Sequence, residues 1–189
     1  MDLSNIPSNL DFYFDDNLRE VPVSTIDMIK GIEFKKKQSH SPQDNEEELA
    51  KTYGLIGVYS RIVNKIEDSK KYLSLAIEMN IQSGNHKSLF VNELRLAHTY
   101  QWETNYHKSN KLFKKLKEQS ESDTEHSNYL DFVYQHYGKN LFDQSEYQLA
   151  LKYVKKALRI RVEKGNKELI DSTEYAINIC NEKIKQIKE

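Results

Sequence analysis

The chain has 189 residues, of which 38% are hydrophobic and 30% are charged, and its formal net charge is −1. This apolar fraction is below that of ordinary globular domains, about 45–50%, and it favours a thin, surface-rich body over one large core. The balanced charge produces no global field that would attract nucleic acid or an anionic membrane, so we expect neither as a partner.

The sequence lacks the usual marks of secretion, membrane insertion and catalysis. Cys180 is the only cysteine, which excludes an intrachain disulfide. The N-terminus has no signal-peptide pattern, and no apolar run reaches the roughly 18 residues that span a bilayer, so we expect a cytoplasmic protein. Metal-ligand spacings, phosphate-binding loops and paired catalytic carboxylates are all missing, so we expect no enzyme activity, no cofactor and no metal.

The N-terminal segment, residues 1–22, is acidic and aromatic. Within residues 10–20, three aromatic residues stand among four acidic residues, and Arg19 is the single base. Such a strip suits a groove lined by cations, so one hypothesis is that it docks on its own or a neighbouring chain until a partner displaces it. The alternatives are a hydrophobic cap on the first helix and a loose tail.

The remaining sequence favours helices joined by short turns. Residues 23–44 are predicted to contain a helix over 23–38, covering one end of the fold, and a linker. From Glu46 onward apolar residues recur every three and four positions without a proline. Gly84 and Gly165 are expected in the left-handed conformation that ends a helix. Helix starts are predicted from Asp44 with Glu47, from Ser145 with Gln148, and from Asp123 before the helix that contains Tyr134.

This helical region repeats itself every 40 or 41 residues. Gly57, Ala97 and Gly138 are 40 and 41 residues apart. The same spacing recurs in three further sets: Ser69, Ser109 and Ala150; Leu73, Phe113 and Val154; Ala76, Leu116 and Ala157. Small residues let paired helices approach closely, and we expect the large ones to fill the space toward the next pair. The period predicts three helix pairs, at 45–84, 85–124 and 125–165, and a capping helix at 166–189.

The third copy matches a known repeat pattern. The tetratricopeptide repeat family has W, L-G, Y, A and F at positions that are occupied here by Tyr134, Tyr137-Gly138, Leu141, Ala150 and Val154. The chain therefore resembles this family, in a lengthened form similar to the repeats of kinesin light chains and bacterial peptide-sensing regulators. The resemblance implies an all-α fold: a right-handed α-α superhelix of three helix pairs with an N-terminal helix and a C-terminal capping helix.

The resemblance also implies a binding site. In this family the first helix of each pair lines a concave groove, and carrying the positions over gives a candidate peptide-binding groove of Lys51, Arg61, Arg95, His98, Gln101, Trp102, Gln135, His136 and Lys139. The cations in this set favour a protein or peptide segment with acidic groups, held by charge-assisted hydrogen bonds. The alternative is that these are solvated helix faces, with Trp102 as a packing plug.

The function expected from this resemblance is a non-catalytic protein- or peptide-binding module, or scaffold. Two alternatives stay open. One is an intracellular signal-peptide sensor or regulator whose groove closes on a short ligand. The other is a self-assembling structural subunit, and a homodimer is open in either case.

Overall fold

A computed structural model describes residues 8–39 and 45–187 of the chain. In chain order its elements are strands β1 (Phe12–Phe14) and β2 (Glu20–Pro22) and helices α1 (Thr25–Gln38), α2 (Glu46–Ile62), α3 (Ile66–Gln82), α4 (His86–Trp102), α5 (Tyr106–Ser122), the short 3-10 helix η2 (Ser127–Tyr129), α6 (Leu130–Asp143), α7 (Tyr147–Lys164) and α8 (Lys167–Gln186). The prediction of a mostly helical protein is confirmed. The β1–β2 hairpin, which is antiparallel, is an addition that the all-α prediction missed.

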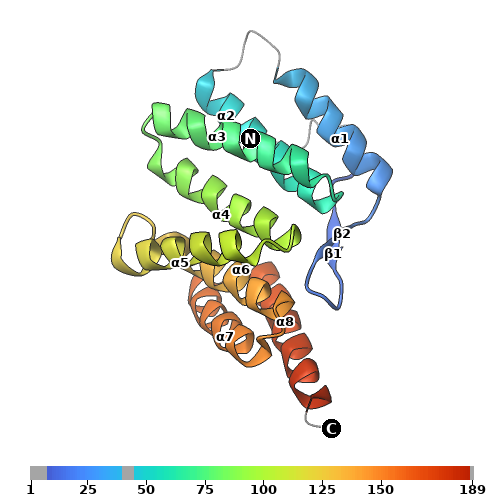
Figure 1. Ribbon diagram of the computed structural model, residues 1–189, viewed down its shortest axis with the longest axis vertical. Helices are drawn as coiled ribbons and strands as arrows, with labels where there is room; N and C mark the ends of the chain where they lie inside the picture. The colour runs from blue at the N-terminus through green and yellow to red at the C-terminus, as the bar shows by residue number, and fades with distance from the viewer. Residues whose placement is uncertain (1–7, 40–44, 188–189) are drawn as a thin grey trace. The chain divides into compact units, whose positions relative to one another are not determined.

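The chain divides into two compact units. Unit 1 comprises Met1–Asp15 and Arg19–Glu103, and unit 2 comprises Asp16–Leu18 and Thr104–Glu189. In unit 1 each helix from α1 to α4 packs against the next, and α2 also contacts α4. In unit 2 the same sequential packing runs from α5 to α8 (Figure 1). Within each unit, therefore, consecutive antiparallel helices pack in the order in which they occur, as in a helical repeat.

Glycine allows the two helices of a pair to approach closely. A Cβ atom built at Gly57 on α2 would lie 2.5 Å from Cγ of Leu73 on α3. One built at Gly138 on α6 would lie 2.7 Å from Cγ1 of Val154 on α7. The predicted tiny residue at this position is thereby confirmed. Leu73 and Val154 therefore lie against the glycine of their own pair, and their expected packing toward the next pair stays a prediction.

Other residues at repeated positions connect the second helix of one pair to the first helix of the next pair. Phe113 on α5 does stack on Tyr137 of α6, with 5.7 Å between ring centroids. Polar contacts accompany this packing: the hydroxyl oxygens of Ser69 on α3 and Thr99 on α4 lie 2.9 Å apart. Repeat-equivalent Ser109 on α5 donates to Oδ1 of Asn140 on α6 over 2.7 Å. Buried hydroxyl groups thus find partners across the joint between pairs, as burial of polar atoms requires.

The turn inside each helix pair contains a residue in the left-handed conformation. Asn64, Thr104 and Ser145 have φ angles of 59°, 60° and 63°, and they stand 40 and 41 residues apart. The turns after α3 and α7 use glycine for the same purpose, since Gly84 and Gly165 have φ angles of 67° and 72°. The prediction for these two glycines is confirmed.

The predicted helix starts are wrong where the structure can test them. Ser145 occupies a left-handed turn, and α7 begins after Glu146 without a side-chain cap. The carboxylate of Asp123 accepts from the Glu125 backbone amide, well before α6 begins at Leu130. The predicted cap Asp44 lies outside the described residues, and Asn45 caps α2 by accepting from the Glu48 amide.

Helix α1 covers one side of α2, as expected for residues 23–38. Met28 and Ile32 of α1 form a buried cluster with Ile56 and Ile62 of α2. Leu10, just before the hairpin, packs against the same cluster. Burial of these apolar side chains holds the N-terminal elements on the helix pairs.

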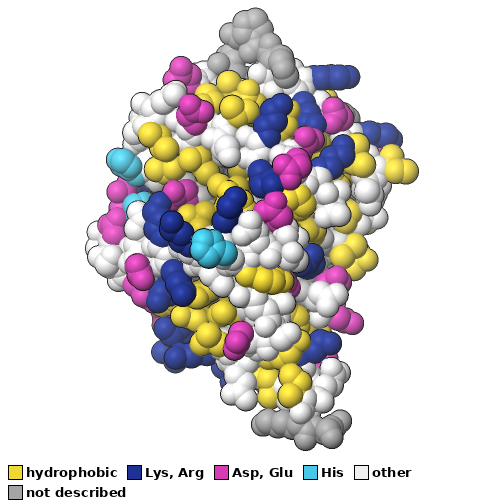
Figure 2. Space-filling view, in the orientation of Figure 1, with side chains coloured by type: hydrophobic (Ala, Val, Ile, Leu, Met, Phe, Trp, Pro, Cys, Tyr) yellow, Lys and Arg dark blue, Asp and Glu magenta, His cyan; other side chains and the backbone are white. Residues whose placement is uncertain are grey.

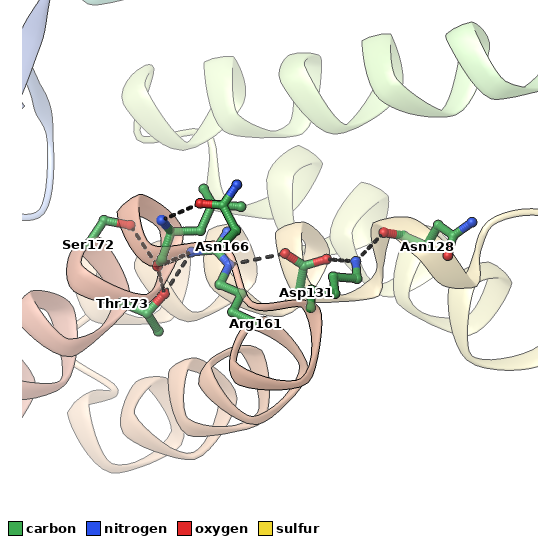
Figure 3. A network of polar contacts seen from close by, with 8 residues as sticks. Asn128, Asp131, Arg161, Asn166, Ser172 and Thr173 are labelled. Atoms are coloured by element: carbon green, nitrogen blue, oxygen red, sulfur yellow. Dashed lines mark hydrogen bonds and ion pairs between the residues drawn. The ribbon is translucent and has the colours of Figure 1, made fainter.

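A buried carboxylate and its arginine join three helices of unit 2. Asp131 on α6 is fully buried and accepts from Nε of Arg161 on α7 over 3.0 Å (Figure 3). Lys164, also on α7, forms a second ion pair with Asp131. Arg161 then donates to Oγ1 of Thr173 on α8 over 2.7 Å, so the predicted C-terminal helix is joined to α6 and α7.

Candidate functional site

The predicted groove residues fall into both units. Those on α2 and α4 belong to unit 1: Lys51, Arg61, Arg95, His98, Gln101 and Trp102. Those on α6 belong to unit 2: Gln135, His136 and Lys139. Helices α2 and α4 contact one another directly, so the structure brings part of the unit 1 set together.

Arg61 forms a buried ion pair with the N-terminal hairpin. Its NH1 donates to Oε2 of Glu20 on β2 over 2.8 Å, and its NH2 lies 3.5 Å from Oε1. The side chains of Arg61 and Glu20 are only 5% and 6% exposed. Nε2 of His98, on α4, lies 3.9 Å from the same carboxylate. The acidic N-terminal strip therefore places a carboxylate on two of the predicted groove residues.

Trp102 extends this cluster. The guanidinium carbons of Arg61 and Arg19 lie 4.9 Å and 5.2 Å from the centre of its ring, both within the range of cation–π attraction. The His98 ring meets Trp102 edge-on, with 6.5 Å between centroids. Trp102 Nε1 is buried and has no hydrogen-bond partner among the described residues. We call Glu20, Arg61, His98 and Trp102, together with Arg19, the hairpin cluster.

Arg95 is a cation without a carboxylate partner in the described part of unit 1. Its NH1 donates to Oδ1 of Asn92 over 3.0 Å, one turn back on α4. Gly54 on α2 makes room for this pair, since a Cβ there would lie 2.5 Å from Asn92 Oδ1 and 2.6 Å from Arg95 NH1. Burial lowers the pKa of the Arg95 guanidinium, and the charge of Arg61 lowers it further, while Tyr59 raises it.

Lys51 forms ion pairs with carboxylates of its own helix. Its Nζ lies 2.9 Å from the carboxylates of both Glu47 and Glu48 on the same helix. The hydrogen bonds to Glu48 and Glu47, in that order, raise the pKa of the lysine. Lys51 therefore belongs to an exposed ion-pair network on the first turns of α2. Its partners in this network, Glu47 and Glu48, are not members of the hairpin cluster.

In unit 2 the predicted residues are mostly inside the helix packing. Gln135 and Lys139 are only 4% and 3% exposed, and His136 is half-buried. The exposed positive charge of this unit lies elsewhere, where dark blue side chains gather over α5 and α7 (Figure 2). The exposed lysines there include Lys111 and Lys152, which occupy the same repeat position. This pattern is typical of a solvated outer face of second helices.

One group of potential metal ligands is present among residues 8–39 and 45–187. Atoms of Asp123, Glu125 and His126 lie within 4.8 Å of one another after the end of α5. Nδ1 of His126 lies 2.6 Å from Oδ2 of Asp123. The Glu125 amide and then His126 lower the pKa of the Asp123 carboxyl group. The Asp123 carboxylate thus has hydrogen-bond partners within its own turn, and these contacts account for its position without a metal ion.

The hairpin cluster contains residues that the repeat pattern did not mark. These are Glu20 and Arg19, which lie outside the repeats. The only signal was the acidic and aromatic character of residues 10–20, which suggested a cation-lined groove without saying which acid would reach it. The period-2 alternation of a strand decides that, because it sets which side chains share a face.

No helix in the described ranges is both long and apolar enough to cross a membrane. No protein-family model matches this chain, and no curated protein matches it either.

Proposed function

We propose that this chain is a non-catalytic binding module of tetratricopeptide-like helix pairs, whose first helices bind a protein or peptide segment that carries acidic groups. The sequential packing of repeated helices within each unit supports the repeat. The right-handed superhelix and its concave groove belong to this proposal, as does the family resemblance of the third copy.

The proposal rests mainly on the surroundings of the Arg95 guanidinium. Its guanidinium is partly buried beside the charge of Arg61, and its bonded partner is the neutral amide of Asn92. A desolvated charge normally acquires a counter-charge, because burial without one is costly. An acidic side chain or terminal carboxylate of a partner would supply it, and a planar guanidinium binds carboxylates with two parallel hydrogen bonds.

The surroundings of Arg95 suit an extended peptide. Arg61 on α2 adds a second guanidinium, and Trp102, on the same helix as Arg95, offers a partly exposed aromatic side chain. Aromatic anchors next to charged groups are the usual composition of strong interaction sites.

Trp102 is the only tryptophan, so its fluorescence reports binding without a label. We would titrate the protein with a set of synthetic peptides containing glutamate and with the same peptides containing glutamine. We expect the acidic peptides to change the Trp102 emission and their glutamine versions to bind much more weakly. Arg95→Gln should weaken binding by about tenfold or more, because a hydrogen bond between charged groups is worth about 1.5–3 kcal/mol.

Lys87→Gln is the matched control, since Lys87 is an exposed cation on the same helix. It changes net charge by the same amount and should leave affinity nearly unchanged at physiological salt. Circular dichroism would establish that both variants keep their helices. Equal affinity losses in Arg95→Gln and Lys87→Gln, or no response to any acidic peptide, would contradict the proposal.

A further inference from the structure

We infer that the β1–β2 hairpin occupies the peptide site of its own chain, with Glu20 in the place of a partner's carboxylate, so that an acidic extended segment binds by displacing it. This inference rests on the proposed function. It adds what the site recognises, namely a carboxylate on an extended strand, and it adds a regulatory contact that limits access to the site.

The position of Glu20 supports this inference first. Its carboxylate bonds to Arg61 and approaches His98, which are groups of the first helices α2 and α4. Glu20 belongs to a strand, so the segment that delivers the carboxylate is extended. The hairpin thus makes with these helices the kind of contact that the proposed partner would make.

The hairpin also fills the site incompletely. One arm of the Arg61–Glu20 pair is long, at 3.5 Å, against 2.8 Å for the other. Trp102 Nε1 stays a buried donor with no acceptor among the described residues. Arg95 keeps its amide partner and no described carboxylate reaches it. A partner that satisfied these groups as well would make more polar contacts than the hairpin does.

The hairpin itself is small enough to be displaced. Its strands pair over three residues each, and a two-stranded hairpin of this size is marginally stable without further packing. Two of its aromatic side chains face solvent, since Phe12 is 42% and Tyr13 is 56% exposed. Leu10 packs on the α1–α2 cluster, so the base of the hairpin can stay anchored while β2 leaves the site.

A peptide with the sequence of residues 8–23 is the natural probe, because it carries Glu20 in its own context and contains no tryptophan. We would measure its binding to the full chain by Trp102 fluorescence, for the wild type and for Glu20→Gln. The substitution removes the charge that competes for Arg61 and keeps the side-chain shape. We expect Glu20→Gln to bind the peptide at least about tenfold more tightly, because a larger fraction of the protein has an open site.

Two controls make this comparison specific. Asp11→Asn removes one negative charge from the same segment at an exposed side chain, and it should bind the peptide like the wild type. A peptide with glutamine at the position of Glu20 should bind Glu20→Gln about tenfold more weakly than the original peptide does. Equal affinity of the wild type and Glu20→Gln for the original peptide would overturn the inference.

Hydrogen exchange on the wild type provides a test that does not depend on a variant folding. At saturating peptide, the backbone amides of Asp15 and Val23, which donate across the hairpin to the carbonyl oxygens of Arg19 and Asp11, should exchange faster than in the free protein. Unchanged protection of these amides with peptide bound would show that the hairpin stays in place, and would overturn the inference.

Failure of the two proposals can be told apart. If peptides bind with the Arg95 dependence described above but the hairpin amides stay protected, the proposed function stands and the inference falls. If neither the wild type nor Glu20→Gln binds any acidic peptide, both proposals are wrong.

Discussion

Oε2 of Glu20 lies 2.8 Å from NH1 of Arg61, and the two side chains are almost completely buried although 41 residues separate them in the chain. A buried ion pair gains little over an apolar contact, because both charges lose hydration. Removing one partner is expensive, since it leaves an uncompensated buried charge. This pair is therefore one of the contacts on which the position of β2 against the helices depends.

A double-mutant cycle would measure the strength of this pair. We expect Glu20→Ala and Arg61→Ala each to lower the free energy of unfolding by about 3 kcal/mol, and the double variant to lose less than the sum. Chemical denaturation gives all four values. The exposed pair of Glu48 and Lys51 is the control, and its coupling should be about 0.5 kcal/mol or less. Similar couplings for both pairs would contradict the burial argument.

The carboxylate of Asp131 should be essential for the stability of unit 2. Asp131→Asn keeps the shape but leaves Arg161 without its ion-pair partner in a buried place. We expect a loss of about 3 kcal/mol, measured as a fall in the midpoint of thermal or urea unfolding. Asp171→Asn, at an exposed position of α8, should have almost no effect. A comparable loss in Asp171→Asn would show that net charge, and not the network at Asp131, is responsible.

Thr104 should be replaceable by glycine with a gain in stability. Its φ angle of 60° is unfavourable for a β-branched residue, and a left-handed conformation costs about 1–2 kcal/mol in a residue with a Cβ. Glycine removes this cost, although it adds freedom to the unfolded chain, so we expect Thr104→Gly to gain about 0.5–1 kcal/mol. Thr124→Gly is the control, because Thr124 has no positive φ, and it should not gain. A loss in Thr104→Gly would disprove the strain.

The thiol of Cys180 should make stability depend on pH under alkaline conditions. The residue is fully buried, and burial raises the pKa of the thiol to about 12. In the unfolded chain the thiol ionises with a pKa of about 8.5. Below that pH both states keep the proton, and above it the unfolded state loses a proton that the folded state retains. The Cys180 contribution to the free energy of unfolding should then fall by up to about 1.4 kcal/mol per pH unit between these two pKa values.

Cys180→Ala isolates this effect from the tyrosines, which also titrate at high pH. The difference in unfolding free energy between the wild type and Cys180→Ala should be constant at neutral pH and should shrink as pH rises above about 8.5. Parallel curves up to pH 10 would mean that the thiol titrates alike in both states.

How much of the site could be predicted differs from one residue to the next. Arg95 and His98 were predicted from their repeat positions, and they do lie on α4 in contact with residues of α2 or the hairpin. Lys51 was predicted for the same reason, yet two glutamates of its own helix hold its charge. The position of a residue within the repeat indicates on which face of the helix its Cα atom lies. It does not fix the contacts of a long side chain, because such a side chain can bend toward a nearby opposite charge.

The sequence by itself determined the helices and the closeness of their packing. The spacing of Gly57, Ala97 and Gly138 is visible without a structure, and at Gly57 and Gly138 the small residue answers a steric need within its helix pair. Turn chemistry was harder to predict. Ser145 fits both a helix cap and a left-handed turn, and only the geometry of the joint between α6 and α7 selected the second.

Only the tertiary structure decided that Glu20 meets Arg61. Four acids stand in residues 10–20, and which of them reaches the cation depends on the hairpin register that pairs Phe14 with Glu20 and Phe12 with Pro22. Since a shift of one residue would turn Glu20 to the opposite face of its strand, the contact depends on how the hairpin pairs and packs. Repeats can be predicted from the spacing of residues along the chain. The contact between Glu20 and Arg61 cannot, because it joins a segment outside the repeats to a helix within them.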